Sequence, residues 1–156
     1  MDRCFPATKY EQQAAQFVGY EAKLAWRLPW KTESWLAVFS DQLRGTLEPG
    51  GDVPRLAPQR YGLSWQQQHG GFTADARLTR GRAQTLPGAN ETPTRGWAQL
   101  NAGLRYTAVA QDGQELSAFL VGRSLNNAEV RNAASFLRNY APEPARSVQL
   151  GVQWLH

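Results

Sequence analysis

Apolar and polar residues alternate along much of the chain with the period of two that is typical of β-strands between two different environments. The clearest example is the closing run 146–155. There, one side carries Val148, Leu150, Val152 and Trp154, and the other carries Ser147, Gln149, Gly151 and Gln153. Residues 17–28 repeat the pattern, with an apolar side opposite a charged one. The pattern therefore predicts an all-β protein whose strands separate two media.

Seven segments carry this alternation and are predicted as strands. They span residues 17–28, 34–47, 60–68, 72–81, 96–110, 115–123 and 146–155, and residues 1–16 are predicted as loop. The second segment is the least regular. Its Trp35, Ala37, Phe39 and Leu43 share one side, but Asp41 interrupts that side.

The connections between these segments alternate between short and long. The short ones are 29–33, 69–71 and 111–114, with His69-Gly70-Gly71 and Asp112-Gly113 as turn signals, and the long ones are 48–59, 82–95 and 124–145. This order predicts an antiparallel up-and-down meander of about seven long strands, with its short turns at one end.

Two architectures fit such a meander. A transmembrane β-barrel wall has strands of about ten residues, an apolar outer side and a polar inner side. A small soluble β-barrel or sandwich that binds an apolar ligand has the same alternation. Strand length favours the transmembrane barrel, because strands of soluble proteins usually have about five or six residues.

Composition agrees with one turn-rich β-domain of 156 residues, with 14 Gly, 9 Pro and 6 Trp. The net charge of +4 comes mostly from scattered arginines. Because no basic run or basic helix is present, nucleic acid is not an expected partner.

Candidate chemistry is sparse. Cys4 is the single cysteine, so neither an internal disulfide nor a thiolate metal cluster is expected. His69 lies in a predicted turn and His156 is the last residue, which argues against a catalytic triad or a two-histidine metal site. The sequence therefore predicts no enzyme activity and no cofactor. Residues 1–10 contain no recognisable secretory signal, and no run of about 18 apolar residues predicts a membrane helix.

Three groups of side chains are candidates for a functional surface. On the polar sides of strands, the candidates for a solvated barrel lumen are Glu21, Lys23, Arg27, Asp75, Arg77 and Arg105. Candidates for an aromatic girdle at the membrane interfaces are Trp26, Trp30, Trp35, Trp65, Trp97 and Trp154; the alternative is that they are core aromatics of a soluble sheet. The loop carboxylates Asp52, Glu91, Glu129 and Glu143 are either ligand contacts or ordinary surface charges.

Several segments resemble the C-terminal barrel portion of TonB-dependent outer-membrane receptors. Ser124-Leu125-Asn126-Asn127 is similar to a motif that follows the family's penultimate strand, and Pro142-Glu143-Pro144-Ala145-Arg146 is similar to the Pro-x-Pro-x-Arg element that follows. FVGYEAKLAW (17–26) and VPRLAPQRYGL (53–63) resemble two elements nearer the start of this portion. The marker residues are thus Asn126, Asn127, Pro142, Pro144 and Arg146. The resemblance covers nearly the whole chain and is closest to the branch with zinc-uptake receptors.

This resemblance implies that residues 1–156 are the last strands of a barrel that has about 22 strands in complete members. Those members import metal ions or metal chelates through a plug domain that the TonB protein remodels. The implied partners are outer-membrane lipid and the barrel-assembly machinery, and TonB only in the full-length family. A plug and further strands would come from another chain.

The leading expectation is therefore a non-enzymatic segment of a TonB-dependent receptor, without its plug, in the outer membrane of a Gram-negative cell. Two other expectations remain open at this point: the soluble apolar-ligand binder described above, and a gene remnant without function. The family commonly ends in an aromatic residue that the assembly machinery reads, whereas this chain ends in Trp154-Leu155-His156.

Overall fold

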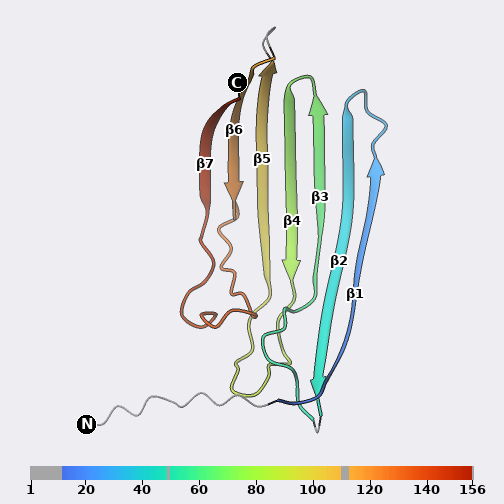
Figure 1. The fold of residues 1–156 in the computed structure, drawn as a ribbon, viewed down its shortest axis with the longest axis vertical. Helices are drawn as coiled ribbons and strands as arrows, with labels where there is room; N and C mark the ends of the chain where they lie inside the picture. Colours follow the sequence, from blue (N-terminus) through green and yellow to red (C-terminus); the bar gives the residue numbers. More distant parts are fainter. Residues whose placement is uncertain (1–11, 49, 110–112, 156) are drawn as a thin grey trace, which may run out of the picture.

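The computed structural model describes residues 12–48, 50–109 and 113–155, and these residues form one antiparallel sheet (Figure 1). Its strands are β1 (Ala15–Arg27), β2 (Glu33–Leu47), β3 (Arg60–His69), β4 (Phe72–Gly81), β5 (Trp97–Val109), β6 (Glu115–Arg123) and β7 (Ser147–Leu155). No helix in this part of the chain is long and apolar enough to cross a membrane.

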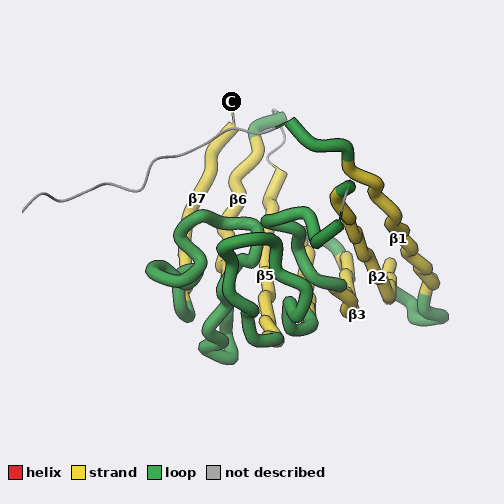
Figure 2. The backbone as a smooth tube through the Cα atoms, turned by 90° about the horizontal axis from the view of Figure 1, so that it is seen from below, coloured by secondary structure: helices red, strands yellow, loops and turns green. Residues whose placement is uncertain are grey.

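The strands follow one another in the sheet in the order β1-β2-β3-β4-β5-β6-β7, so every neighbour in sequence is a neighbour in space. The short connections lie at one end of the sheet and the long connections at the other (Figure 1). Seen from the end of the long connections, the three loops are grouped together (Figure 2). The predicted all-β meander and its asymmetry of connections are therefore confirmed.

The strand boundaries agree with the sequence prediction to within about two residues. One correction concerns Ala15 and Gln16, which were predicted as loop but belong to β1. They extend β1 because β2 continues to Leu47 and offers them backbone partners, pairing Ala15 with Leu47 and Gln16 with Thr46. The predicted loop before residue 12, Cys4, the Asp112 half of the Asp112-Gly113 turn and His156 lie outside the described residues.

The sheet does not close on itself within the described residues. β1 pairs with β2 alone, and β7 pairs with β6 alone. One edge of each terminal strand therefore presents backbone N–H and C=O groups that have no strand beside them, a state that proteins usually avoid by covering or pairing such edges.

Cross-strand pairing divides the side chains into two faces. We call apolar face the side that carries the cross-strand row Leu24, Val38, Leu63, Leu78 and Leu100. The opposite side, the polar face, carries most of the charged strand residues. Paired residues of an antiparallel sheet lie on the same side, so the register assigns every strand residue to one of the two faces.

The apolar face has no covering layer in the described structure. Leu24 is 57% exposed, Leu63 is 41% exposed and Leu150 is 80% exposed. Buried apolar residues are instead Ala37 on the polar face and Val130 and Ala133 in the last long loop. The described part of the chain thus packs its loops against the polar face and leaves its apolar side chains accessible, the reverse of a water-soluble sheet.

Aromatic rings on the polar face lie over glycines of the neighbouring strand. Phe39 pairs with Gly62, and Phe119 pairs with Gly151. A Cβ atom at Gly62 would lie 2.8 Å from Phe39 Cζ, and one at Gly151 would collide with the Phe119 ring. Glycine therefore leaves room for the ring at both positions, and at Gly62 it also avoids a collision with the Leu78 carbonyl oxygen; such ring-over-glycine pairs help to fix register.

Candidate functional site

The polar face brings together the charged residues that were predicted to line a lumen. The register places all of the following on this face: Glu21, Lys23, Arg27, Asp75, Arg77 and Arg105. Arg60 joins them and forms an ion pair with Asp41, with Nε 3.0 Å from Oδ1. The residue that made the second strand look irregular is therefore half of a cross-strand ion pair.

Two of these arginines lie over aromatic rings. The Arg77 guanidinium carbon is 4.1 Å from the centre of the Phe39 ring, and that of Arg105 is 5.4 Å from the centre of the Phe119 ring. These are the same rings that lie over glycines. The cation–π contacts hold the cations close to the sheet while their N–H groups stay available to a polar ligand.

A polar groove separates this face from the last long loop, residues 124–146. The strand side of the groove includes Asp75, Asn101 and Arg123, and the loop side includes Glu143. Its lining combines amide, carboxylate and guanidinium groups with small apolar residues, so the groove suits a polar ligand. Within the described ranges, no group of three or more His, Cys, Asp or Glu residues is placed to hold a metal ion.

The three long loops meet at the carboxylate of Glu91. Its Oε2 accepts hydrogen bonds from the backbone N–H groups of Arg55 and Gly88, each at 3.1 Å. Its Oε1 lies 3.2 Å from Nη1 of Arg138. Arg55, Glu91 and Arg138 belong to the first, second and third long loops respectively, so one carboxylate joins all three.

This Glu91 junction is buried: the side chain of Glu91 is 11% exposed and that of Arg138 is 6% exposed. Burial raises the pKa of Glu91, but the hydrogen bonds from Arg55 and Gly88 and the Arg138 guanidinium together hold that pKa below its ordinary value. Glu91 is therefore ionised at neutral pH and balances the buried charge of Arg138.

Further contacts hold the two arginines of the Glu91 junction, Arg138 and Arg55, in place. Arg138 Nη1 donates to the Ala133 carbonyl at 3.1 Å, and Arg131 Nη1 donates to the carbonyls of Arg138 and Asn139. The guanidinium of Arg55 lies 3.5 Å from the centre of the Phe136 ring. The three long loops therefore contact one another and form one connected structure.

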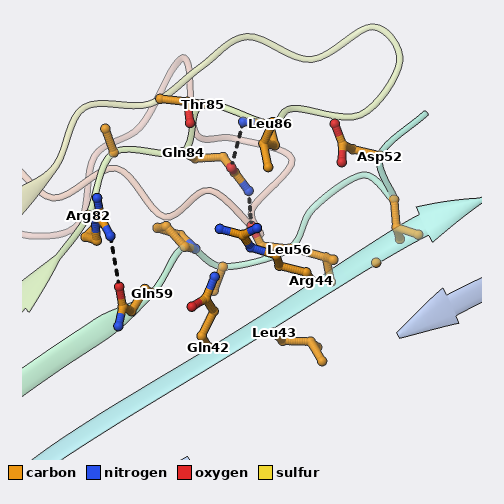
Figure 3. Close-up of a pocket in the computed structure, with 15 residues that line it drawn as sticks. Gln42, Leu43, Arg44, Asp52, Leu56, Gln59, Arg82, Gln84, Thr85 and Leu86 are labelled. Carbon is orange, nitrogen blue, oxygen red and sulfur yellow. Dashed lines mark hydrogen bonds between the residues drawn. The ribbon is translucent and has the colours of Figure 1, made fainter. Parts of the chain in front are cut away.

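The first two long loops are also joined through Gln84. Its Nε2 donates to the Leu56 carbonyl at 2.8 Å and its Oε1 accepts from the Leu86 N–H at 3.1 Å (Figure 3). Beside it, Arg82 donates to the side-chain oxygen of Gln59 (Figure 3). These contacts enclose a small cavity against the end of β2, lined also by Arg44 and Asp52.

The sequence offered no signal that separated Glu91 from the other loop carboxylates. Glu129 is exposed and forms an ion pair with Arg131, Asp52 lines the cavity beside β2, and Glu143 lines the polar groove. A network made by three loops far apart in the sequence has no periodicity, so pattern reasoning has nothing to detect.

The residues of the two family-like motifs close the neck of the last long loop. Asn126 continues the pairing of β5: its Oδ1 accepts from the Leu100 N–H at 3.1 Å and its Nδ2 donates to the Ala98 carbonyl at 2.7 Å. Asn127 Oδ1 accepts from the Arg146 N–H at 3.4 Å. Ser124 and Asn127 have φ values of 49° and 53°, so this segment turns sharply away from the sheet.

The Pro-x-Pro-x-Arg-like element lies on the other side of this neck. Pro142 and Pro144 are exposed and flank Glu143, whose N–H donates to the Val130 carbonyl at 2.8 Å. Each proline restricts the backbone to an extended or turn conformation. The marker residues thus have structural roles in shaping the loop.

The tryptophans divide between the two faces. Trp26, Trp65 and Trp154 lie on the apolar face, Trp30 lies in the turn between β1 and β2, and Trp35 and Trp97 lie on the polar face. The register excludes the last two from a girdle around the apolar face, because Trp35 pairs with Arg27 and Trp97 pairs with Gly81.

Tyrosine and phenylalanine side chains that the sequence prediction did not name complete an aromatic border of the apolar face. Tyr20 and Tyr61 lie toward the end with the long loops, and Phe72 and Tyr106 form a pair, with ring centres 4.5 Å apart, at the end with the short turns. His69 also lies at that end of the apolar face, opposite Phe72.

The chain matches no protein-family model and no curated protein sequence.

Proposed function

We propose that this chain is a segment of the wall of an outer-membrane β-barrel of the TonB-dependent receptor type, with its apolar face toward lipid and its polar face toward the lumen. The main support for this proposal is the exposed apolar face. Contiguous apolar surfaces of this kind mark contact with a membrane or another protein. Lipid accounts for this face better than a single partner protein does, because the exposed apolar side chains extend over all seven strands.

The distribution of residue types on the apolar face supports this orientation. An aliphatic middle lies between aromatic residues at both ends, which is the arrangement of a transmembrane barrel exterior. β1 has 13 residues, which at about 3.3 Å each give a strand of roughly 40 Å, and a barrel tilt of about 40° leaves a height of roughly 30 Å. A barrel exterior has an apolar band about 25 Å tall, so the dimensions are compatible.

The polar face supports a role in ligand passage and not in catalysis. Its charged groups are dispersed over several strands and several are held by rings or ion pairs. In a barrel wall they line a water-filled interior, where a charged side chain keeps its hydration. By the sequence resemblance, the proposed cargo class is a metal ion or a metal chelate, and the long loops face the side where cargo arrives.

The proposed barrel needs more strands than those described. The free edges of β1 and β7 are to be paired by strands of the same protein or of another chain, since a lipid-exposed strand edge leaves backbone polar groups without partners. The proposed complete receptor also contains a plug and a TonB-binding segment. The barrel-assembly machinery is the partner expected to insert it into the membrane.

Adjacent positions on β5 test the orientation directly. Leu104 faces the apolar side and Arg105 faces the polar side. In a Cys4→Ser background, Leu104→Cys and Arg105→Cys are each labelled with a fluorophore after reconstitution into lipid vesicles. We expect quenching of the first label by brominated lipid tails and of the second by iodide in water.

The opposite result identifies the alternatives. A chain that stays in the soluble fraction without detergent, refolds cooperatively in buffer and exposes both labels to iodide is a soluble apolar-ligand binder. A chain that neither folds in buffer nor inserts into vesicles is a remnant. Either outcome refutes the proposal.

A further inference from the structure

Two strand arginines lie on the apolar side of the sheet: Arg44 of β2, which pairs with Val18 and lines the cavity between the first two long loops, and Arg80 of β4. Arg80 of β4 pairs with Tyr61 of β3 and with Ala98 of β5. This cross-strand row borders the aliphatic row that contains Leu63, Leu78 and Leu100. Arg80 is the penultimate residue of β4, so it lies where the apolar face ends, beside the second long loop.

Arg80 is not satisfied by a carboxylate of the described chain. The ion pairs among those residues join Arg60 with Asp41, Arg131 with Glu129 and Arg138 with Glu91. The side chain is exposed, and its neighbour Ala98 has no bulk to cover it. The N–H donors of a guanidinium that is exposed at an apolar border are accessible to an anionic group.

Two hollows meet at this residue. One is apolar and is lined by Leu24, Val38, Leu63 and Leu78. The other is basic and includes Arg82. Tyr61 and Arg80 line both hollows, so an apolar surface continues directly into a pair of guanidinium groups.

We propose that this continuous surface is a binding site for an anionic, phosphate-bearing membrane lipid, with the phosphate at Arg80 and an acyl chain in the apolar hollow. The site rests on the proposed function, because a lipid reaches it only if the apolar face is in a membrane. It adds selection of a lipid headgroup, which a featureless apolar wall does not provide.

The chemistry of the border row fits a lipid phosphate. Arginine binds phosphate oxygens through two parallel N–H donors, and such charge-assisted bonds are stronger than neutral ones. Hydroxyl groups are also present at this border, on Tyr61 and on Ser40, whose Oγ lies 3.2 Å from the Tyr20 hydroxyl. The aliphatic row supplies the surface that an acyl chain covers.

The test compares lipids that differ in headgroup charge. The full chain is reconstituted into phosphatidylcholine vesicles with a trace of spin-labelled phosphatidylglycerol or spin-labelled phosphatidylcholine, and the protein-bound fraction of each probe is measured by electron spin resonance. One basic residue near an anionic surface contributes about 1 kcal/mol, so we expect roughly a fivefold preference for phosphatidylglycerol.

Variants assign that preference to the site. Arg80→Gln is expected to lower it to nearly one, and Arg80→Lys to retain most of it. Arg77→Gln is the matched control: it removes a guanidinium from the same strand but from the polar face, and it should leave the preference unchanged. Excess inorganic phosphate should not displace the lipid probe, because the acyl chain contributes to binding.

Three outcomes overturn the inference in distinguishable ways. A preference that survives Arg80→Gln, or that Arg77→Gln reduces equally, shows general charge attraction and no site. Displacement by inorganic phosphate shows a simple anion site. Failure of the unaltered chain to insert into vesicles refutes the proposed function together with the lipid site, whereas insertion without headgroup preference refutes the lipid site alone.

Discussion

At the scale of single residues, the most consequential side chain is Glu91. It lies in a polar, proline-containing stretch that the sequence marks only as loop. In the structure its carboxylate accepts two backbone N–H groups and an ion pair, and thereby joins three loops. A buried charge that is paired in this way costs most when only one partner is removed.

Replacing Glu91 with Gln tests this role. The amide keeps the size of the side chain but leaves the Arg138 charge buried without its counter-ion, so we expect the free energy of unfolding to fall by about 3 kcal/mol. Urea denaturation in detergent measures the change. Glu129→Gln is the control, because Glu129 is 65% exposed and such surface pairs contribute less than about 1 kcal/mol. Equal effects of the two substitutions would contradict the junction.

Acid is expected to weaken the same junction. The pKa of Glu91 is lowered in the folded chain, so its stabilising contribution is complete above the ordinary glutamate value of 4.5 and is lost as the pH falls through the lowered pKa. The urea midpoint of the unaltered chain should therefore be constant near neutral pH and decline in acid. The Glu91→Gln variant should lack the part of that decline that belongs to this carboxyl group; an identical acid profile would disprove its contribution.

At the scale of elements, the sequence predicted the strands well because each strand separates two environments along its whole length. Residues 72–81 and 115–123 were predicted with their observed bounds. β2 was harder to interpret, since Phe39 and Ala37 lie on the polar face. They are placed there by packing onto the neighbouring strand and the loops, which alternation alone does not reveal.

The turn at Asn126 gives a prediction at this scale. Asn126→Asp keeps an acceptor for the Leu100 N–H but removes the donor to the Ala98 carbonyl, so the start of β5 should lose protection while the middle of β5 keeps it. A single hydrogen bond contributes about 1 kcal/mol. Hydrogen exchange of residues 97–101 is the readout. Asn132→Asp, in the loop beyond the turn, should leave these residues unchanged, and protection that is equal in both variants would contradict the capping role.

At the scale of the whole molecule, the open sheet makes the chain dependent on its surroundings. The free edge of β7 combines unpaired backbone groups with Leu150 and Val152, which are 80% and 70% exposed. An apolar strand with a free edge is a template for pairing with another chain. Without lipid, detergent or further strands, the same features that suit a barrel wall favour aggregation.

Dilution out of detergent is therefore expected to produce self-association. Val152→Lys places a charge on the apolar face of the edge strand and should slow it severalfold, as measured by light scattering. Gln149→Lys adds the same charge to the polar face of β7 and should have a smaller effect. A chain that stays monomeric in plain buffer would contradict both the edge argument and the proposed membrane location.

The sequence by itself determined the seven strands, their meander order and the separation of charged from apolar sides, because a period of two is a local property that burial on one side enforces. Only the tertiary structure decided which faces Trp35 and Trp97 occupy, how Glu91 joins the three loops and that Arg80 borders an aliphatic row. These depend on register and on contacts between distant segments, and the energies that select them are absent from any single strand's pattern.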